Sequence, residues 1–374
     1  MLIAADSKIP FLKGVFEPFA DVRYLDPAGF TPETIRGADA LVIRTRTKCA
    51  APLLDGSRVA MIATATIGAD HIDAPYCAAH GIEWTNAPGC NAASVAQYVT
   101  SALLRISIRH DVALRGKTLG VVGCGNVGSK VAAAAAALGM NVLVNDPPRA
   151  EREGESGFVS LERIQQDADF ITLHVPLTGS GPHRTRHLAD ESFFRGLKRK
   201  PFFLNTSRGD VADETALKAA IVAGRISGAG LDVWHDEPAV DRELLSLAEL
   251  ATPHIAGYST DGKANGTAMT VRAVARHFGI APLYDFFPAE IPAPTNPVVT
   301  LNPSSPHPLA DAVFASYDVE SDDAALRAAT ESFEALRGSY RVRREFPVYT
   351  VRLSGGEQDG SLRDTLRKLG FRLD

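Results

Sequence analysis

A glycine-rich turn and a later aspartate have the spacing of a dinucleotide-binding site. The segment Gly123-Cys124-Gly125-Asn126-Val127-Gly128 follows an apolar run and precedes an alanine-rich stretch typical of a helix. The first glycine would permit a tight turn, the second would let a diphosphate approach the backbone, and the third would let the helix pack on the strand. Asp146, about 20 residues further on, would accept both ribose hydroxyls and repel a 2'-phosphate. We therefore predict NAD in preference to NADP, and leave mixed use open because Arg149 follows closely.

Three charged side chains, Arg208, Glu237 and His254, follow separate candidate strands in the second half of the chain. Carboxyl ends of strands in an open sheet face the ligand crevice. An imidazole can remove a proton near neutral pH, and a carboxylate can stabilise the imidazolium that results. A guanidinium can hold a planar carboxylate through two charge-assisted hydrogen bonds. Taken singly, each residue also has an ordinary structural explanation: a solvated arginine, a Glu-Pro turn and a structural histidine.

Short apolar runs alternate with helical segments from residue 1 to about residue 93. Four runs are too short for core helices and read as strands: 2–5, 22–25, 40–43 and 59–63. Such alternation favours a parallel sheet covered by helices.

A long helix capped by Ser94 is then predicted, and it is followed by a second unit in which candidate strands again alternate with helices. Its five candidate strands are 118–122, 141–144, 170–173, 202–204 and 230–233. The sequence therefore predicts an α/β protein with two parallel-sheet domains of Rossmann-like or flavodoxin-like type.

The remainder of the chain predicts a linker and a small α+β C-terminal domain. Eight prolines occur between residues 281 and 308, too many for a continuous helix or a central strand, so we expect a linker over 286–308. Beyond it, residues 321–336 carry an apolar helical stripe and 348–351 read as a strand. A core of roughly 65 residues is marginal alone, so we expect 309–374 to be a dimerisation domain that pairs with a second copy.

Length and composition exclude several classes of protein. A chain of 374 residues suggests two or three domains, and 45% hydrophobic with 22% charged residues is ordinary globular usage. A formal charge of -5 disfavours nonspecific binding to nucleic acid or anionic lipid. The four cysteines match no metal-ligand spacing or disulfide framework. With no secretory or membrane-spanning segment visible, we expect a cytoplasmic protein without a metal.

The glycine turn with Asp146, the segment from Asn205 to Asp213, the run Gly230-Leu231-Asp232-Val233 leading to Glu237, and Pro253-His254 together resemble the D-2-hydroxyacid dehydrogenases. The resemblance covers about residues 1–285. It implies that Arg208 binds the substrate carboxylate, that His254 takes the hydroxyl proton, and that Glu237 pairs with His254. It also implies a substrate domain from 1–93 and 255–285 around an NAD-binding domain at 94–254.

The same resemblance implies a larger set of cofactor contacts. These are Gly123, Gly125, Asn126, Val127, Gly128, Asp146, Val175, Thr206, Ser207, Arg208, Asp232 and Gly257. Asp232 would contact the nicotinamide end, and Thr206 and Ser207 would line the cofactor.

A more specific resemblance is to a branch of the family that oxidises a phosphorylated hydroxy acid in pyridoxal 5'-phosphate synthesis. It rests on segments 64–71, 145–149, 254–259 and 262–264 and on Arg343-Arg344-Glu345. It implies substrate contacts from Thr45, Thr66 and Tyr258.

Arg44 and Arg46 flank Thr45 at the end of a candidate strand. Residues two apart on a strand share a face, so both could hold one phosphate; the alternative is that they are surface charges. If the tail dimerises, Arg343 or Arg344 of a partner subunit could reach the same phosphate.

Two rival functions remain open at this stage. A D-2-hydroxyacid dehydrogenase of 3-phosphoglycerate or glyoxylate/hydroxypyruvate type would share the catalytic residues and differ in substrate. An NAD-sensing corepressor-like binding protein could retain the fold without turnover.

Overall fold

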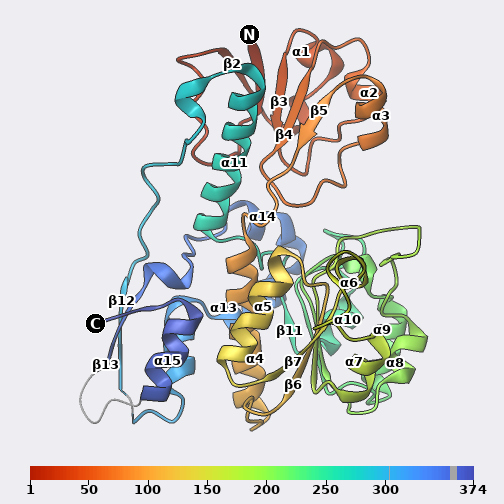
Figure 1. Ribbon diagram of the computed structural model, residues 1–374, viewed down its shortest axis with the longest axis vertical. Helices are drawn as coiled ribbons and strands as arrows, with labels where there is room; N and C mark the ends of the chain where they lie inside the picture. Colours follow the sequence, from red (N-terminus) through yellow and green to blue (C-terminus); the bar gives the residue numbers. More distant parts are fainter. Residues whose placement is uncertain (303, 354–359) are drawn as a thin grey trace. The chain divides into compact units, whose positions relative to one another are not determined.

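In a computed structural model that describes residues 1–302, 304–353 and 360–374, the chain forms two compact units (Figure 1). The first unit comprises residues 1–91 and 260–292. The second comprises residues 92–259 and 293–374. The chain passes from the first unit to the second after residue 91, returns to the first unit at residue 260, and enters the second again at residue 293.

The first unit is built on a parallel sheet of five strands in the order β2-β1-β3-β4-β5. The strands are β1 (Leu2–Asp6), β2 (Asp21–Leu25), β3 (Ala40–Ile43), β4 (Met61–Thr64) and β5 (Glu83–Thr85). This order is the flavodoxin-like one, with a change of direction between β1 and β3. The predicted runs at 2–5, 22–25, 40–43 and 59–63 correspond to β1 to β4, whereas the short, partly exposed β5 was missed.

Helices cover both faces of this sheet (Figure 1). The long helix α11 (Thr260–Phe278) packs Val271, Val274 and Ala275 against residues of β1, β3 and β4 on one face. Three short helices lie on the other face: α1 (Pro32–Ile35), α2 (Ala51–Leu54) and α3 (Ala74–Ala79). Burial on both faces explains why these strands read as continuous apolar runs.

The second unit has a six-stranded parallel sheet in the order β11-β10-β9-β8-β6-β7. Its strands are β6 (Thr118–Val122), β7 (Asn141–Asn145), β8 (Phe170–Leu173), β9 (Phe202–Asn205), β10 (Gly228–Leu231) and β11 (Leu250–Ala251). The chain order reverses at β6, which lies between β7 and β8. In doubly wound sheets the ligand crevice lies at the carboxyl ends of the strands beside such a reversal.

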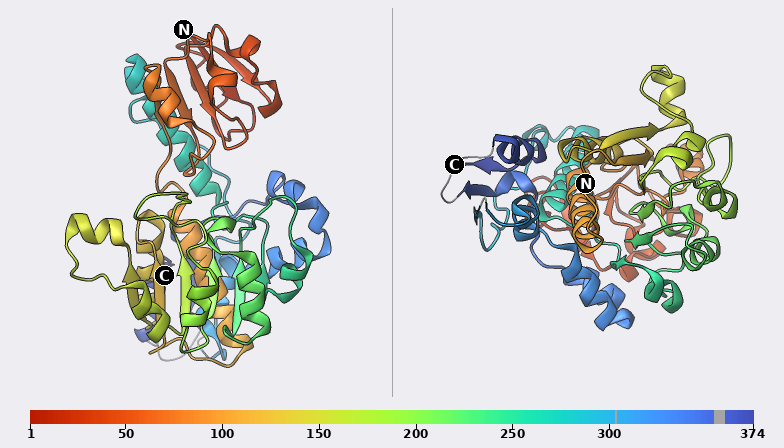
Figure 2. Two further views of the ribbon diagram at one scale, coloured as in Figure 1. Left: turned by 90° about the vertical axis from the view of Figure 1, so that its right-hand side faces the viewer. Right: turned by 90° about the horizontal axis from the view of Figure 1, so that it is seen from below.

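Two helix layers flank this sheet (Figures 1 and 2). On one side lie α4 (Ala92–Arg109) and α5 (Asn126–Ala137), which share a core with β6. On the other side lie α7 (Leu161–Asp167), α8 (Glu191–Gly196), α9 (Glu214–Val222) and α10 (Arg242–Leu247), and α6 (Pro147–Glu153) follows β7. Each of α6 to α10 begins after an aspartate or serine whose side chain caps the first turn, namely Asp146, Ser160, Asp190, Asp213 and Asp241.

The C-terminal segment packs onto the α4–α5 layer and does not form a separate core (Figure 2). It contains a parallel sheet of β12 (Val298–Leu301), β13 (Thr350–Leu353) and β14 (Arg372–Leu373). Its helices are α12 (Pro308–Ser316), α13 (Val319–Ala328), α14 (Phe333–Gly338) and α15 (Gly360–Leu369). Apolar residues of this segment and of α4 belong to one hydrophobic cluster. The segment, predicted to be too small for a stable core alone, thus shares its core with α4 of the same chain.

Two further expectations for this region need correction. Residues 298–301, inside the predicted linker, form the edge strand β12, because the adjoining prolines leave these four residues free to pair on one side. The predicted helix over 321–336 is interrupted at Ala329, where φ is -148° and the chain leaves α13 before α14 begins.

Within the residues described, none of the helices combines the length and the apolar character that crossing a bilayer requires.

Candidate active site

The turn between β6 and α5 leaves room for an anion against the backbone. Gly123 has φ of 85°, in the left-handed region that favours glycine. A Cβ on Gly128 would lie 1.9 Å from the carbonyl oxygen of Gly123, so the close contact between the turn and the helix requires glycine there. A Cβ on Gly125 would meet open space, and no side chain caps the N-terminus of α5. The helix therefore presents amide groups and the positive end of its dipole to a ligand.

Asp146 joins this turn to the helix after β7. One carboxylate oxygen accepts a hydrogen bond from the amide of Cys124 at 2.7 Å, and the other accepts one from the amide of Arg149 at 3.0 Å. The carboxylate thus caps α6 and fixes the position of the glycine turn. Its remaining lone pairs can still accept hydrogen bonds.

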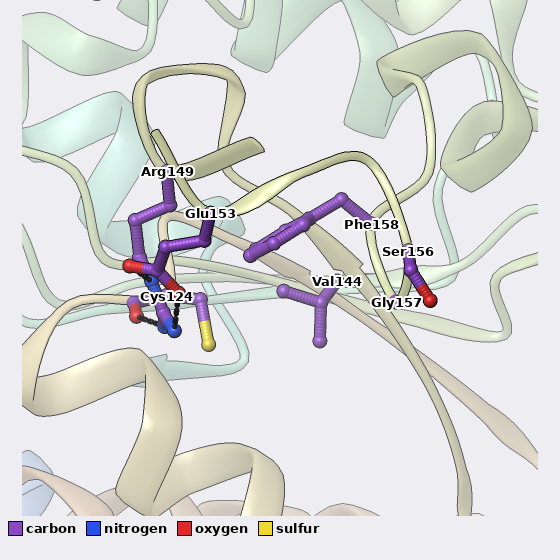
Figure 3. A pocket seen from close by; sticks show the side chains of 7 residues that line it. All are labelled: Cys124, Val144, Arg149, Glu153, Ser156, Gly157 and Phe158. Atoms are coloured by element: carbon purple, nitrogen blue, oxygen red, sulfur yellow. Dashed lines mark hydrogen bonds and ion pairs between the residues drawn. The ribbon is translucent and has the colours of Figure 1, made fainter. Parts of the chain in front are cut away.

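A cavity of about 320 Å³ has Cys124 and Arg149 in its lining, and because the amides of both bind Asp146 it is called here the cavity beside Asp146 (Figure 3). It is lined by Cys124, Val144, Arg149, Glu153, Ser156, Gly157 and Phe158. Of these residues, the sequence had marked Arg149 as a possible phosphate contact and Cys124 as part of the glycine turn. The signal that could have found the others is their closeness in sequence to Asp146, the expected ribose-binding acid: Val144 precedes it in β7, and the rest lie at the end of α6 or shortly after it.

His254 and Glu237 form the central pair of the candidate site. His254 Nδ1 lies 2.7 Å from one oxygen of Glu237, and the other oxygen accepts a hydrogen bond from the amide of Trp234 at 3.0 Å. Burial by itself raises the pKa of Glu237, but the hydrogen bond and charge of His254, together with the Trp234 amide and the charge of Arg337, outweigh it, so the pKa is lowered overall. An ionised Glu237 favours the tautomer with the proton on Nδ1, which leaves Nε2 to accept a proton.

Asp232 positions the loop that carries His254. This carboxylate is 1% exposed and accepts hydrogen bonds from the Thr252 hydroxyl at 2.6 Å and from the amides of Ile255 and Ala256 at 2.8 Å. These bonds hold the chain on both sides of His254, whose φ of 55° is unusual for a residue with a Cβ. Burial raises the pKa of Asp232 to about 6, opposed by the charge of His254 and by these hydrogen bonds.

Arg208 follows β9, next to the strand that leads to Asp232 and Glu237. Gly209 brings the two loops together, since a Cβ at this position would lie 2.1 Å from the Trp234 backbone. Asn205 ties the Arg208 loop to its strand through its amide group, which donates to the Arg208 carbonyl at 2.9 Å. The half-buried guanidinium of Arg208 donates to the Ser207 carbonyl at 2.8 Å.

His174, which the sequence did not single out, supports Thr206 beneath the glycine turn. Its ring nitrogens lie 3.3 Å from the Thr206 hydroxyl and 2.9 Å from the Thr172 hydroxyl. Burial lowers the pKa of His174 to about 3, so the ring is neutral. The next residue, Val175, is close to Gly123, since a Cβ on that glycine would lie 2.7 Å from a Val175 methyl group.

The remaining predicted substrate residues are divided between the two units. Arg44, Thr45, Arg46 and Thr66 lie in loops that follow β3 and β4 of the first unit, and Tyr258 lies in the second. The argument that Arg44 and Arg46 share the face of a strand is wrong, because β3 ends at Ile43 and a turn follows. The Arg44 Nε donates to the fully buried Asp6 at 3.1 Å.

Lys263 on α11 is a second cation close to Arg44. Its pKa is lowered, first by burial and then by the charge of Arg44. The sequence marked Lys263 only as part of a resembling segment. The buried Asp6 carboxylate, which pairs with Arg44, offsets part of this positive charge.

Arg343 does not have the role that was considered for it. It is 2% exposed, and its guanidinium donates to the Gln97 side chain at 2.9 Å and to the carbonyls of Ile255, Ala256 and Ser94. It also stacks 3.6 Å from the centre of the Tyr317 ring. With its fork fully engaged inside its own subunit, Arg343 cannot extend to a phosphate elsewhere. It joins α4, the His254 loop and the C-terminal segment.

Comparison with known proteins gives the family. The model for the NAD-binding domain of D-isomer specific 2-hydroxyacid dehydrogenases matches residues 97–256, and a domain of unknown function, DUF3410, matches residues 291–370. A Bacteroides thetaiotaomicron protein named erythronate-4-phosphate dehydrogenase is 48% identical over 352 residues, which cover 94% of this chain and 99% of the relative. The chain belongs to the D-isomer specific 2-hydroxyacid dehydrogenase family. The predicted resemblance is confirmed.

Another relative and a solved structure support the same family and fold. A Klebsiella pneumoniae protein named erythronate-4-phosphate dehydrogenase is 39% identical and covers 99% of this chain and 98% of its own. The crystal structure of Aquifex aeolicus D-lactate dehydrogenase, complexed with NAD and lactic acid, is 28% identical with a TM-score of 0.64, covering 77% of this chain and 98% of that chain. The dehydrogenase is an NAD-dependent oxidoreductase with the predicted α/β fold.

The residues of the dehydrogenase fit an NAD molecule. The open backbone at Gly125 and the uncapped start of α5 suit the diphosphate, and Asp146 suits a ribose. The cavity beside Asp146 offers an apolar side at Val144 and Phe158.

Arg337 is a further residue of the dehydrogenase that the sequence did not reveal. It lies on α14 with a side chain that is 14% exposed, 5.5 Å from the Tyr258 ring centre and 3.2 Å from Glu334. Its charge also contributes to lowering the pKa of Glu237. The C-terminal segment thus places a cation beside the residues next to His254.

Replacing Glu237 by Gln is expected to lower kcat, because the imidazolium that forms on His254 as the hydroxyl proton is taken loses the carboxylate that stabilises it. We expect a loss of about tenfold, equivalent to about 1.4 kcal/mol. Initial rates at saturating NAD and hydroxy acid measure it. Asp236→Asn, which neutralises the exposed neighbour, is the matched control. An unchanged kcat in Glu237→Gln would contradict the pairing role.

Proposed function

We propose that this dehydrogenase oxidises 4-phospho-D-erythronate at C2 to 2-oxo-3-hydroxy-4-phosphobutanoate, a step in pyridoxal 5'-phosphate (vitamin B6) synthesis. The 2.7 Å contact between His254 and Glu237, at the carboxyl ends of the strands of the sheet that also carries the glycine turn, supports the reaction type. The substrate is supported by the 48% identical relative named erythronate-4-phosphate dehydrogenase.

In the proposed mechanism His254 is the general base. NAD, when bound, accepts the hydride that leaves C2. His254 Nε2 takes the proton of the C2 hydroxyl as the C–H bond breaks, and Glu237 stabilises the imidazolium that forms. A positioned base of this kind contributes about 10²- to 10⁴-fold to the rate. Asp232 keeps the imidazole in place through the backbone on either side of it.

Arg208 is proposed to hold the substrate carboxylate. Its planar fork can form two parallel hydrogen bonds with a carboxylate, which fixes the orientation of C2 as well as binding the acid. The resemblance also supports a set of contacts to NAD. We propose that these are made by Asn126 and Val127 at the start of α5 and by Val175, Thr206, Ser207 and Gly257.

The first unit is proposed to bind the substrate phosphate. Arg44 and Lys263 supply two cations there, and the charge of Arg44 contributes, after burial, to the lowered pKa of Lys263. Thr45, Arg46 and Thr66 lie in the adjoining loops, and Tyr258 is proposed as a further substrate contact. In this assignment residues 1–91 and 260–292 form the substrate domain, and the sheet of the second unit forms the NAD domain.

A panel of hydroxy acids tests the substrate. Purified protein with NAD is incubated with 4-phospho-D-erythronate, D-erythronate, 3-phospho-D-glycerate and D-lactate, and NADH is followed by absorbance. We expect kcat/KM for the phosphorylated acid to exceed that for D-erythronate by about 100-fold, as about 3 kcal/mol of charge-assisted bonding implies. Arg44→Gln should reduce this preference, while Lys48→Gln in the same loop should not. Preference for another acid would overturn the substrate, and no turnover would favour an NAD-sensing role.

We also propose that the protein is a homodimer that pairs through the C-terminal segment. The edge strand β12 supports this, because Val298 on it is 43% exposed and strands at the edge of a sheet can pair with another chain. Since that segment shares a core with α4, truncation would also expose the core, so light scattering of the whole chain is the cleaner measurement. Twice the mass of one chain is expected.

A cytoplasmic location is proposed because all four cysteines are free thiols.

A further inference from the structure

The guanidinium of Arg149 is held in a fixed position at the edge of the cavity beside Asp146 (Figure 3). Its Nε and one Nη donate to the two oxygens of Glu153 at 2.9 and 2.6 Å, so the ion pair is bidentate. The other Nη donates to the carbonyl of Cys124, in the glycine turn. The side chain also lies 5.4 Å from the centre of the Phe158 ring.

In this arrangement the Arg149 guanidinium, the cation that could neutralise a 2'-phosphate, is already bound to other groups. Arg149 lies in the first turn of α6, and its own amide donates to Asp146 at 3.0 Å. A phosphate on the ribose held by Asp146 would therefore arrive close to this guanidinium. Arginine binds phosphates through a free, charged fork. Here the fork is paired with Glu153 and the turn carbonyl, and its charge is balanced by the Glu153 carboxylate.

We propose that Glu153 is a specificity-determining residue that excludes NADP by keeping Arg149 engaged. The inference rests on the proposed ribose-binding role of Asp146. Two features then act against a 2'-phosphate. Asp146 repels it directly, and Glu153 both adds a second negative charge to the cavity and withholds the guanidinium that could neutralise the phosphate.

The alternative is that Asp146 alone excludes NADP and that Glu153 only stabilises the end of α6. An i,i+4 ion pair on a helix contributes little to stability, so a purely structural role predicts almost no effect on nucleotide choice. The two explanations differ in what happens when Glu153 loses its charge.

The experiment is a titration of the whole chain with NAD and with NADP, without substrate, to obtain both dissociation constants. In Glu153→Gln we expect the ratio of NADP to NAD affinity to rise about tenfold, the size of one added charge-assisted contact. Arg149→Met in the Glu153→Gln background should abolish the gain. Glu151→Gln is the matched control, because Glu151 lies on the same helix, carries the same charge and pairs with His183 outside the cavity lining.

Different outcomes would overturn the role of Glu153, the mechanism through Arg149, or the cofactor site. An unchanged ratio in Glu153→Gln, or an equal rise in Glu151→Gln, would overturn the role of Glu153 while leaving NAD binding in place. A gain that survives loss of Arg149 would overturn the mechanism through the guanidinium. A wild-type chain that bound neither nucleotide would instead overturn the cofactor site itself.

Discussion

Replacing His254 by Ala is expected to lower kcat about 10²- to 10⁴-fold, because the reaction loses the base that takes the hydroxyl proton. The imidazole bonds to Glu237, while the loop around it is held through backbone amides by Asp232. The substitution therefore removes the proton acceptor without removing the bonds that hold the loop. Initial rates of NADH formation at saturating NAD and hydroxy acid measure the effect.

NAD affinity decides whether this loss is catalytic. The glycine turn and Asp146 lie at β6 and β7, whereas His254 follows β11 at the other edge of the sheet. We expect the NAD dissociation constant of His254→Ala to stay close to that of the wild type. His80→Ala, an exposed histidine of the first unit, should retain full kcat. A collapse of NAD binding in His254→Ala would show that the residue supports the cofactor site instead.

Replacing Arg208 by Lys is expected to lower kcat/KM for the hydroxy acid about 100-fold, which corresponds to about 3 kcal/mol of lost charge-assisted hydrogen bonding. Lysine keeps the charge but cannot offer two parallel donors to a planar carboxylate. The loss should fall on the acid and leave the KM for NAD within a few-fold. Steady-state rates with each reactant varied in turn separate the two.

The prediction for Arg208→Lys has a matched control and a result that would contradict it. Arg225→Lys, an exposed arginine after α9, makes the same chemical change away from the candidate site and should leave kcat/KM unchanged. If Arg208→Lys left the kinetics of the acid intact, the guanidinium would not hold the carboxylate. Its hydrogen bond to the Ser207 carbonyl would then be its main role.

Much of the fold was predictable because local signals and tertiary structure agree. The buried strands β1, β3, β6 and β8 are continuous apolar runs, as expected for parallel strands covered on both faces. The missed strands β5 and β11 have three and two residues, too short for a pattern to appear. The strand predicted at 230–233 begins two residues earlier in the structure, where Gly228 and Ala229 pair with β9.

The C-terminal segment shows where such reasoning fails. Its apolar stripe was visible, but whether that stripe meets a second copy or the same chain depends on contacts between residues far apart in sequence. In the structure Leu326 and Phe333 of that stripe join a hydrophobic cluster of the same chain that includes residues of α10, and Arg343 binds Gln97 almost 250 positions away. A pair of adjacent arginines looks the same in a printed sequence whether it faces a phosphate or fills a core.

By itself the sequence determined the fold class, the cofactor-binding turn and the family, because these depend on short motifs and on the period of apolar residues. Only the tertiary structure decided that Asp232 is buried beneath the His254 loop, that Arg149 is engaged by Glu153, and that Arg343 is internal. The reason is physical: a motif specifies which groups are present, but hydrogen-bond partners and burial determine which of them remain available to a ligand.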